Sequence, residues 1–100
     1  MKRLDPLIHE PLRLQIMSIL YIDEMSTFNN FKTQLDATDG NLSQHLRKLE
    51  DAGYIRVKKT FEGRKPKTYY YLTKKGREKY LEYIKTIEEI LKIARSERGK

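Results

Sequence analysis

The spacing of the apolar residues changes once along this 100-residue chain and then changes back, and this constrains the fold more than any other feature. Up to Gly53 the apolar residues recur at steps of three and four, the repeat of an α-helix. From Tyr54 to Leu72 they alternate with polar residues, as in strands with one buried face. Beyond Thr73 the helical repeat returns. The sequence therefore predicts a mainly α domain of the α+β class, in which one hairpin interrupts the helices.

A short helical segment and three full helices are predicted before the hairpin. Residues 4–8 suggest a short helical segment, and residues 11–22 a first full helix with proline in its first turn, where proline is tolerated. The serine or threonine at 26–27 can cap a second helix. Thr38 can cap a third, which ends at Gly53 because glycine adopts the left-handed conformation of a C-cap. The residues expected on the buried faces of the second and third helices are Phe28, Phe31, Leu35, Leu42, Leu46 and Leu49.

The hairpin is predicted over residues 55–72, with a turn within 61–66 that contains both glycine and proline. Alternation predicts that Tyr70 faces the core, while Tyr69 and Tyr71 cover the other face of the sheet. The alternative is that these tyrosines stack on unpaired bases, as aromatic residues on sheets do in RNA-binding proteins. We favour the first interpretation.

A last helix is predicted from Thr73 to about Arg95, and its ~22 residues would span roughly 33 Å. Its apolar residues follow alternating steps of four and three, as in a coiled coil. Such a helix overshoots a small body, so the half over residues 87–94 is expected to need a partner, and a two-fold dimer is the common solution. The alternative is that the stripe packs on the protein's own body. The residues assigned to dimerisation are Tyr80, Ile84, Ile87, Leu91 and Ala94.

Positive charge is concentrated in the predicted hairpin. The formal net charge is +7, and residues 56–72 hold six basic residues against Glu62 alone, whereas residues 1–55 are slightly acidic. The basic residues could simply keep an exposed hairpin in solution. The interpretation we favour is that they contact the phosphates of a nucleic acid. The residues assigned to such contacts are Lys58, Lys59, Arg64, Lys65 and Lys67.

Two short helices, a tight turn and a two-stranded hairpin together form a helix-turn-helix followed by a wing. In that arrangement the third helix stands clear of the body and can enter the major groove of DNA. Asparagine and glutamine can bind adenine, arginine can bind guanine or a phosphate, and Lys48 suits a phosphate. His45 lies at the edge of the buried face and is expected to pack or to make a local hydrogen bond. The residues predicted on or beside the outward face are Gly40, Asn41, Ser43, Gln44, Arg47, Lys48 and Asp51.

Three segments resemble the ArsR- and MarR-like winged-helix transcriptional regulators over roughly residues 7–80. Residues 9–20 resemble the first helix of that family, and residues 38–55 its recognition helix and exit. Residues 63–77 resemble the wing and the Leu-Thr-x-x-Gly start of the next helix. The resemblance implies a homodimeric regulator of transcription that binds double-stranded DNA, with residues 1–75 as its DNA-binding domain and residues 76–100 as the C-terminal dimerisation helix. It also implies groove contacts by Asn41, Ser43, Gln44, Arg47 and Lys48, and a wing tip of Arg64 and Lys65.

No cofactor, metal or enzymatic activity is expected. The chain has no cysteine, which excludes disulfides, thiolate metal sites and a cysteine nucleophile. Its two histidines, His9 and His45, are too far apart in sequence to indicate a metal site, although a site completed across a dimer stays open. No glycine-rich phosphate loop or nucleophile elbow is present. The chain is shorter than typical drug-sensing MarR members, which leaves less room for the pocket of an effector.

The sequence contains neither the ~20-residue apolar run of a membrane span nor the core of a signal peptide at its start, so a cytoplasmic protein without a membrane partner is expected. Two alternatives to sequence-specific DNA binding remain. One is a winged-helix module that binds other proteins, against which the basic hairpin argues. The other is a non-specific architectural or RNA-binding role.

Overall fold

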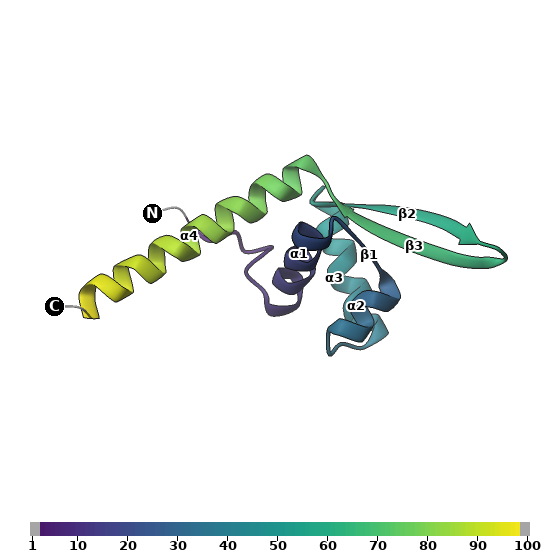
Figure 1. The fold of residues 1–100 in the computed structure, drawn as a ribbon, viewed down its shortest axis with the longest axis horizontal. Helices are drawn as coiled ribbons and strands as arrows, with labels where there is room; N and C mark the ends of the chain where they lie inside the picture. Colours follow the sequence, from purple (N-terminus) through teal and green to yellow (C-terminus); the bar gives the residue numbers. More distant parts are fainter. Residues whose placement is uncertain (1–2, 99–100) are drawn as a thin grey trace.

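A computed structural model describes residues 3–98 of the protein (Figure 1). In chain order its elements are α1 (Pro11–Asp23), β1 (Met25–Thr27), α2 (Phe28–Gln34), α3 (Asp39–Asp51), β2 (Ile55–Glu62), β3 (Lys65–Leu72) and α4 (Lys74–Arg98). The structure confirms the four full helices and the hairpin predicted from the sequence. The prediction of a short helix over residues 4–8 is wrong. The segment makes one turn, in which the N–H of His9 donates to the carbonyl of Asp5 at 2.8 Å, and Pro11 then begins α1.

The sheet contains three antiparallel strands in the order β1-β3-β2, one more than the predicted hairpin. The additional strand, β1, pairs with β3 from Met25 opposite Tyr71 to Thr27 opposite Tyr69. Three residues are too few to produce a recognisable alternation. Thr27 also caps α2, since its hydroxyl accepts the N–H of Asn30 at 3.1 Å. The cap was predicted from the sequence, but the strand that leads into it was not.

The core lies between helices α1 to α3, the inner face of the sheet and the first turns of α4. Tyr70 is buried on the inner face, with its ring edge-on to Phe31 at 5.6 Å between centroids, while Tyr69 and Tyr71 lie on the outer face. The predicted role of Tyr70 is therefore confirmed, and so is the buried stripe of α3. The buried apolar residues are Ile8, Ile16, Met17, Leu20, Phe31, Leu35, Leu42, Leu46, Leu49, Tyr54, Ile55, Tyr70, Tyr80 and Tyr83.

The molecule is elongated, with extents of 62 × 26 × 21 Å. Figure 1 shows why: the β2–β3 hairpin and α4 extend in opposite directions from the small helical body, and α2 and α3 lie on one side of that axis. The tip of the hairpin and the C-terminal half of α4 therefore project beyond the core.

The start of α4 is fixed closely against the exit of α3. The hydroxyl of Thr73 caps α4 by accepting the N–H of Gly76 at 2.9 Å, and it donates to the carbonyl of Gly53 at 2.6 Å. Gly76 is buried, and a Cβ at this position would lie 1.9 Å from the carbonyl oxygen of Tyr54. This contact explains the glycine of the Leu-Thr-x-x-Gly motif, because no other residue lets the helix approach so closely.

Candidate nucleic-acid interface

The outward face of α3 is polar and accessible. All seven of the residues predicted on or beside this face are exposed, and Thr38 caps the helix by accepting the N–H of Asn41 at 3.2 Å. Among residues 3–98 the structure gives the side chains of Ser43, Gln44, Arg47 and Lys48 no hydrogen bond or ion pair. Their donors and acceptors are thus available to a ligand. A shallow groove along this face is lined by Gly40, Ser43, Gln44, Arg47, Lys48 and Asp51.

A second depression connects α3 to the hairpin. Arg47 and Ser43 line it from the helix, and Lys59 lines it from β2. Glu50 also lines this depression and is the only acidic residue among those that line it. Two cations from different elements therefore converge beside the exposed face of the helix. A polyanion lying along α3 would meet both of them.

The lysines of the hairpin are divided between its two faces. Val57 and Lys59 alternate with Lys58 along β2, so Lys59 shares the face that packs on α3. Lys58 lies on the outer face opposite Tyr69, and Lys67 lies opposite Thr60 on that same face. The predicted set of five basic residues is therefore not one continuous surface: only Lys59 faces the same way as Arg47.

On the outer face, Glu62 has two partners. Its carboxylate accepts the hydroxyl of Tyr69 at 2.7 Å and forms an ion pair with Lys67 at 3.5 Å. The hydrogen bond from Tyr69 and the charge of Lys67 lower the pKa of Glu62, and the same hydrogen bond raises the pKa of Tyr69. Lys67 is thus occupied within the protein. Tyr69 is engaged in the same way, which favours a structural role for this tyrosine over stacking on bases.

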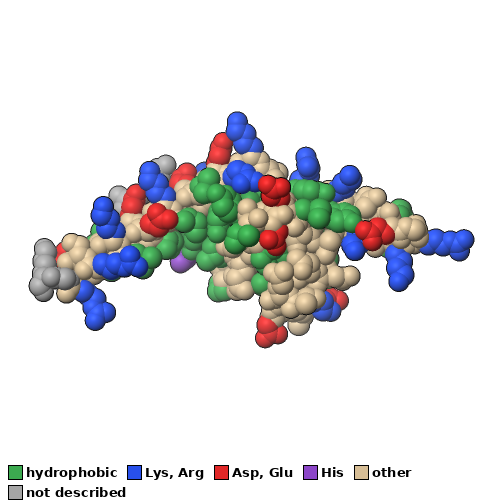
Figure 2. All heavy atoms as spheres, in the orientation of Figure 1, with side chains coloured by type: hydrophobic (Ala, Val, Ile, Leu, Met, Phe, Trp, Pro, Cys, Tyr) green, Lys and Arg blue, Asp and Glu red, His purple; other side chains and the backbone are tan. Residues whose placement is uncertain are grey.

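The tip of the hairpin is a two-residue turn. Gly63 has a φ of 62°, and a type II′ turn requires glycine at this position. Arg64 lies in this turn and Lys65 begins β3, and both are exposed at the end of the hairpin that projects along the long axis (Figure 1). Lys and Arg side chains project from this end of the molecule in Figure 2. The predicted wing tip therefore places positive charge at the end of the molecule opposite to α4.

A partly buried polar network connects α1 to α3, and only the local role of His45 in it was predicted. The guanidinium of Arg13 donates from Nε to the carbonyl of Leu7 at 2.5 Å and from Nη1 to Nδ1 of His45 at 2.9 Å. Because arginine can only donate, Nδ1 of His45 is the acceptor in this bond. Glu10 lies 3.8 Å from Arg13 and 3.5 Å from His45. The hydrogen-bonding role predicted for His45 is confirmed.

Glu10 also caps α1, since its two carboxylate oxygens accept the N–H groups of Leu12 at 3.0 Å and Arg13 at 2.8 Å. Partial burial raises the pKa of Glu10, but these hydrogen bonds and the neighbouring positive charge outweigh it. The net result is a pKa below the ordinary value of 4.5. The charged carboxylate therefore stabilises the fold above pH 4.5, and this stabilisation is lost as the pH falls through the lowered pKa.

We expect the Glu10→Gln variant to be less stable than the unmodified protein at neutral pH, and the difference to shrink on acidification below pH 4.5. Glutamine keeps one acceptor oxygen but loses the charge and the second acceptor. Urea denaturation across this pH range measures both free energies of unfolding. Glu78→Gln, at an exposed position of α4, is the matched control and should leave the pH dependence unchanged. A constant difference between Glu10→Gln and the unmodified protein at all pH values would contradict the role of the charge.

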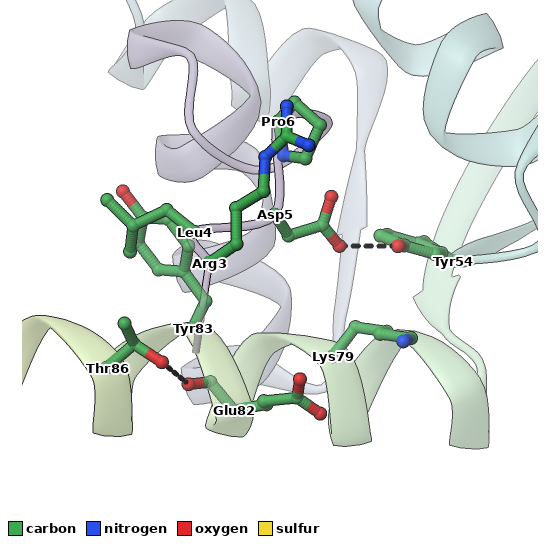
Figure 3. A pocket seen from close by; sticks show the side chains of 9 residues that line it. All are labelled: Arg3, Leu4, Asp5, Pro6, Tyr54, Lys79, Glu82, Tyr83 and Thr86. Atoms are coloured by element: carbon green, nitrogen blue, oxygen red, sulfur yellow. Dashed lines mark hydrogen bonds between the residues drawn. The ribbon is translucent and has the colours of Figure 1, made fainter. Parts of the chain in front are cut away.

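The N-terminal segment and α4 enclose a pocket of about 320 Å³, drawn in Figure 3. On one side the hydroxyl of Tyr54 donates to a carboxylate oxygen of Asp5 at 2.5 Å. Burial raises the pKa of Tyr54, and the bond to Asp5 raises it further, so the phenol stays protonated. The pocket carries side chains of both charges and contains none of the residues predicted to bind DNA. Its lining is Arg3, Leu4, Asp5, Pro6, Tyr54, Lys79, Glu82, Tyr83 and Thr86.

The residues predicted to form a dimer seam on α4 fall into two groups. Tyr80 is buried in the protein's own body, where its hydroxyl is hydrogen-bonded to that of Ser18 at 2.9 Å, and Ile84 and Ile87 pack partly against the core. Leu91 and Ala94 are exposed, the former by 46%. Beyond Ile87 the helix therefore presents apolar side chains to solvent, whereas the first half of the stripe is used internally.

Within residues 3–98, no group of three or more histidine, aspartate or glutamate side chains is arranged to hold a metal ion. No helix in the part of the chain that the structure describes is long and apolar enough to cross a membrane.

The helix-turn-helix, the antiparallel sheet and the projecting hairpin together define a winged-helix domain. A sequence model of the winged helix DNA-binding domain family matches residues 12–91, and the chain belongs to this family. This confirms the resemblance inferred from the sequence. An uncharacterized protein of Methanocaldococcus jannaschii is 40% identical over 81 residues, which are 81% of this chain and 88% of the relative.

Solved structures share the fold. A transcriptional regulator homologue from Pyrococcus horikoshii superposes with a TM-score of 0.81 at 29% identity, over 86% of this chain and 85% of its own. A MarR-family protein described as a transcriptional regulator, from Enterococcus faecalis, gives 0.82 at 21% identity, over 94% and 84%. PadR of Bacillus subtilis, solved in complex with operator DNA, gives 0.67 at 21% identity, over 75% and 47%. The last two similarities concern the fold alone.

Proposed function

We propose that this protein regulates transcription by binding specific double-stranded DNA as a homodimer. In this proposal α3 occupies the major groove and the hairpin contacts the flanking backbone or minor groove. The observation that carries the proposal is the set of unpaired polar side chains along the outward face of α3, with Arg47 beside Lys59 of the wing. Polar groups on a helix of this kind can pair with base edges, and cations on a neighbouring strand can neutralise phosphates. Membership of the winged helix DNA-binding domain family supports the same conclusion.

The dimer is proposed from the exposed apolar end of α4. Ile90, Leu91 and Ile93 are exposed by 37%, 46% and 51% in the C-terminal half of a 25-residue helix. Ile90 and Leu91 continue the stripe of Ile87, and a second copy of the helix packed along this stripe would cover them. Two copies related by a two-fold axis would contact two half-sites in an inverted repeat, at a spacing of one helical turn of DNA or a multiple of it.

The experiment that tests the proposal is selection of tightly bound duplexes from a random pool near physiological salt. An enriched inverted repeat is expected, and it would supply the operator. Recovery of unrelated sequences would contradict sequence-specific binding and favour an architectural role. Binding of single-stranded RNA in preference to duplex would favour the RNA-binding alternative, although Tyr69 is already bonded to Glu62.

On the selected duplex, we expect Arg47→Ala to weaken binding by about 1–3 kcal/mol and to relax the base preference at one position. The Lys48→Ala variant should weaken binding to all duplexes by a similar factor, because a phosphate contact carries no sequence information. Lys85→Ala removes one positive charge from an exposed position of α4 and is the matched control. Gel-shift titrations on the operator and on single-base variants measure all three. A uniform loss with Arg47→Ala would mean that this arginine contacts a phosphate.

A further inference from the structure

The wing carries an exposed apolar pair among its charges. Phe61 is 70% exposed and stands one residue before the last residue of β2. Pro66 is exposed opposite to it on β3. An aromatic ring in this position contributes little to the core, which ends with the partly buried Val57 nearer the body. The pair therefore suggests contact with another molecule rather than a contribution to the packing of the domain.

The register determines the side of the hairpin on which the pair lies. Val57, Lys59 and Phe61 alternate with outer-face residues, so all three share the side of β2 that packs on α3. Pro66 has no N–H, so the pair cannot be one that exchanges two hydrogen bonds. It is a non-hydrogen-bonded pair, in which the side chains lie closest. Phe61 and Pro66 thus form one compact apolar unit, which we call the wing wedge.

The wing wedge has basic residues on both sides and stands away from the body, while the neighbouring carboxylate of Glu62 is paired with Lys67 and Tyr69 on the outer face. Lys59 precedes Phe61 on the same face, Arg64 lies in the turn, and Lys65 precedes Pro66 at the start of β3. Four residues separate Phe61 from Val57, which corresponds to about 14 Å along the strand. A surface complementary to the wing wedge must be negatively charged and must contain a narrow apolar cleft. The grooves of DNA provide both, with phosphates at their edges and base faces between the stacked steps.

We propose that the wing wedge enters the minor groove beside the site of α3 and partly separates one base step, while the flanking cations neutralise the adjacent phosphates. The inference rests on the proposed function and adds to it a source of specificity that makes no hydrogen bond to a base. Phenylalanine and proline side chains inserted between base steps from the minor groove bend the duplex toward its major groove. Pyrimidine–purine steps deform most easily, so the wing selects such a step at a position outside the reach of α3.

The test uses the full chain and the selected operator in two forms. One form has a TA step under the wing, and the other has an A-tract there. 2-Aminopurine at the step reports unstacking, and fluorescence transfer between the duplex ends reports bending. The unmodified protein is expected to bind the TA duplex about tenfold more tightly, to bend it and to raise the 2-aminopurine fluorescence. Phe61→Thr, which keeps a residue suited to strands, is expected to bind both forms equally without bending either.

Ile22→Ala is the matched control, because Ile22 is 75% exposed at the end of α1 and lies outside the interface. It should behave as the unmodified protein. Equal bending and equal step preference with Phe61→Thr would overturn the wedge and leave Phe61 a support for the hairpin. If Phe61→Thr fails to fold, the unmodified protein decides alone: a straight duplex with unchanged fluorescence overturns the wedge. If no duplex is selected at all, the proposed function fails together with the wedge. If the duplex stays straight but Arg47→Ala still weakens operator binding, the wedge fails and the proposed function stands.

Discussion

Replacing Gly76 with alanine is expected to destabilise the protein by about 3 kcal/mol, near the upper end of the range for overpacking. The added Cβ would lie 1.9 Å from the carbonyl oxygen of Tyr54, and this neighbour is backbone, which cannot rotate away as a side chain can. α4 would have to move off the strand junction, which breaks the bond between Thr73 and Gly53. Urea denaturation followed by circular dichroism measures the loss.

The control for this variant is Gly40→Ala. Gly40 lies in the first turn of α3 with open space where its Cβ would be, so alanine should change the free energy of unfolding by less than about 1 kcal/mol, in the stabilising direction. The two variants add the same methyl group to helix-start glycines of one protein. Similar stabilities would show that α4 can shift without cost, contrary to the close approach described above.

Leu91→Glu is expected to convert the proposed dimer into a monomer and to weaken operator binding by at least about 100-fold. A dimer engages its second half-site at a high effective concentration, and a monomer loses that advantage. Leu91 is preferable to Ile87 as the site of the charge, because Ile87 packs partly against the protein's own core and its replacement would confuse dissociation with unfolding. Analytical sedimentation at micromolar concentration and gel-shift titration give the two readouts.

Lys92→Glu serves as the control, since it introduces the same carboxylate at the adjacent exposed position but leaves the apolar side chains in place. It should remain dimeric. An unmodified protein that sediments as a monomer at micromolar concentration would end the dimer proposal, while the assignment of α3 to the groove would still be tested separately by Arg47→Ala.

Sequence reasoning succeeded where the determining interactions are local. The caps at Thr27, Thr38 and Thr73 each depend on a hydroxyl and an N–H three residues away, and the buried face of α3 follows from helical spacing. It missed β1, because a three-residue strand is defined by its pairing with β3, more than forty residues later. No pattern within one segment reports such a distant partner.

The same distinction applies to the candidate site. The residues on α3 could be selected from the sequence, because they follow from the buried stripe of that helix. The division of the basic residues between two faces was only partly predictable. Alternation with Val57 separates Lys58 from Lys59, but the position of Lys65 depends on the turn, which was predicted within residues 61–66 while the structure has only Gly63 and Arg64 in it. The burial of Arg13 could not be predicted from the sequence either. Its partners are a carbonyl in the preceding segment and a histidine on another helix.

The junction at Gly53, Thr73 and Gly76 has a consequence for how such proteins diversify. It joins the end of α3 to the beginning of a single unbroken helix of 25 residues, about 37 Å long. The angle between α3 and the far end of α4 is therefore set by this joint together with the packing of Tyr80 and Ile84 on the body. In a dimer held together at the far end of α4, a small change of angle at the junction would shift the two α3 helices by a larger distance, because α4 is long. The preferred separation of the two half-sites could then change without any alteration of the residues that contact DNA.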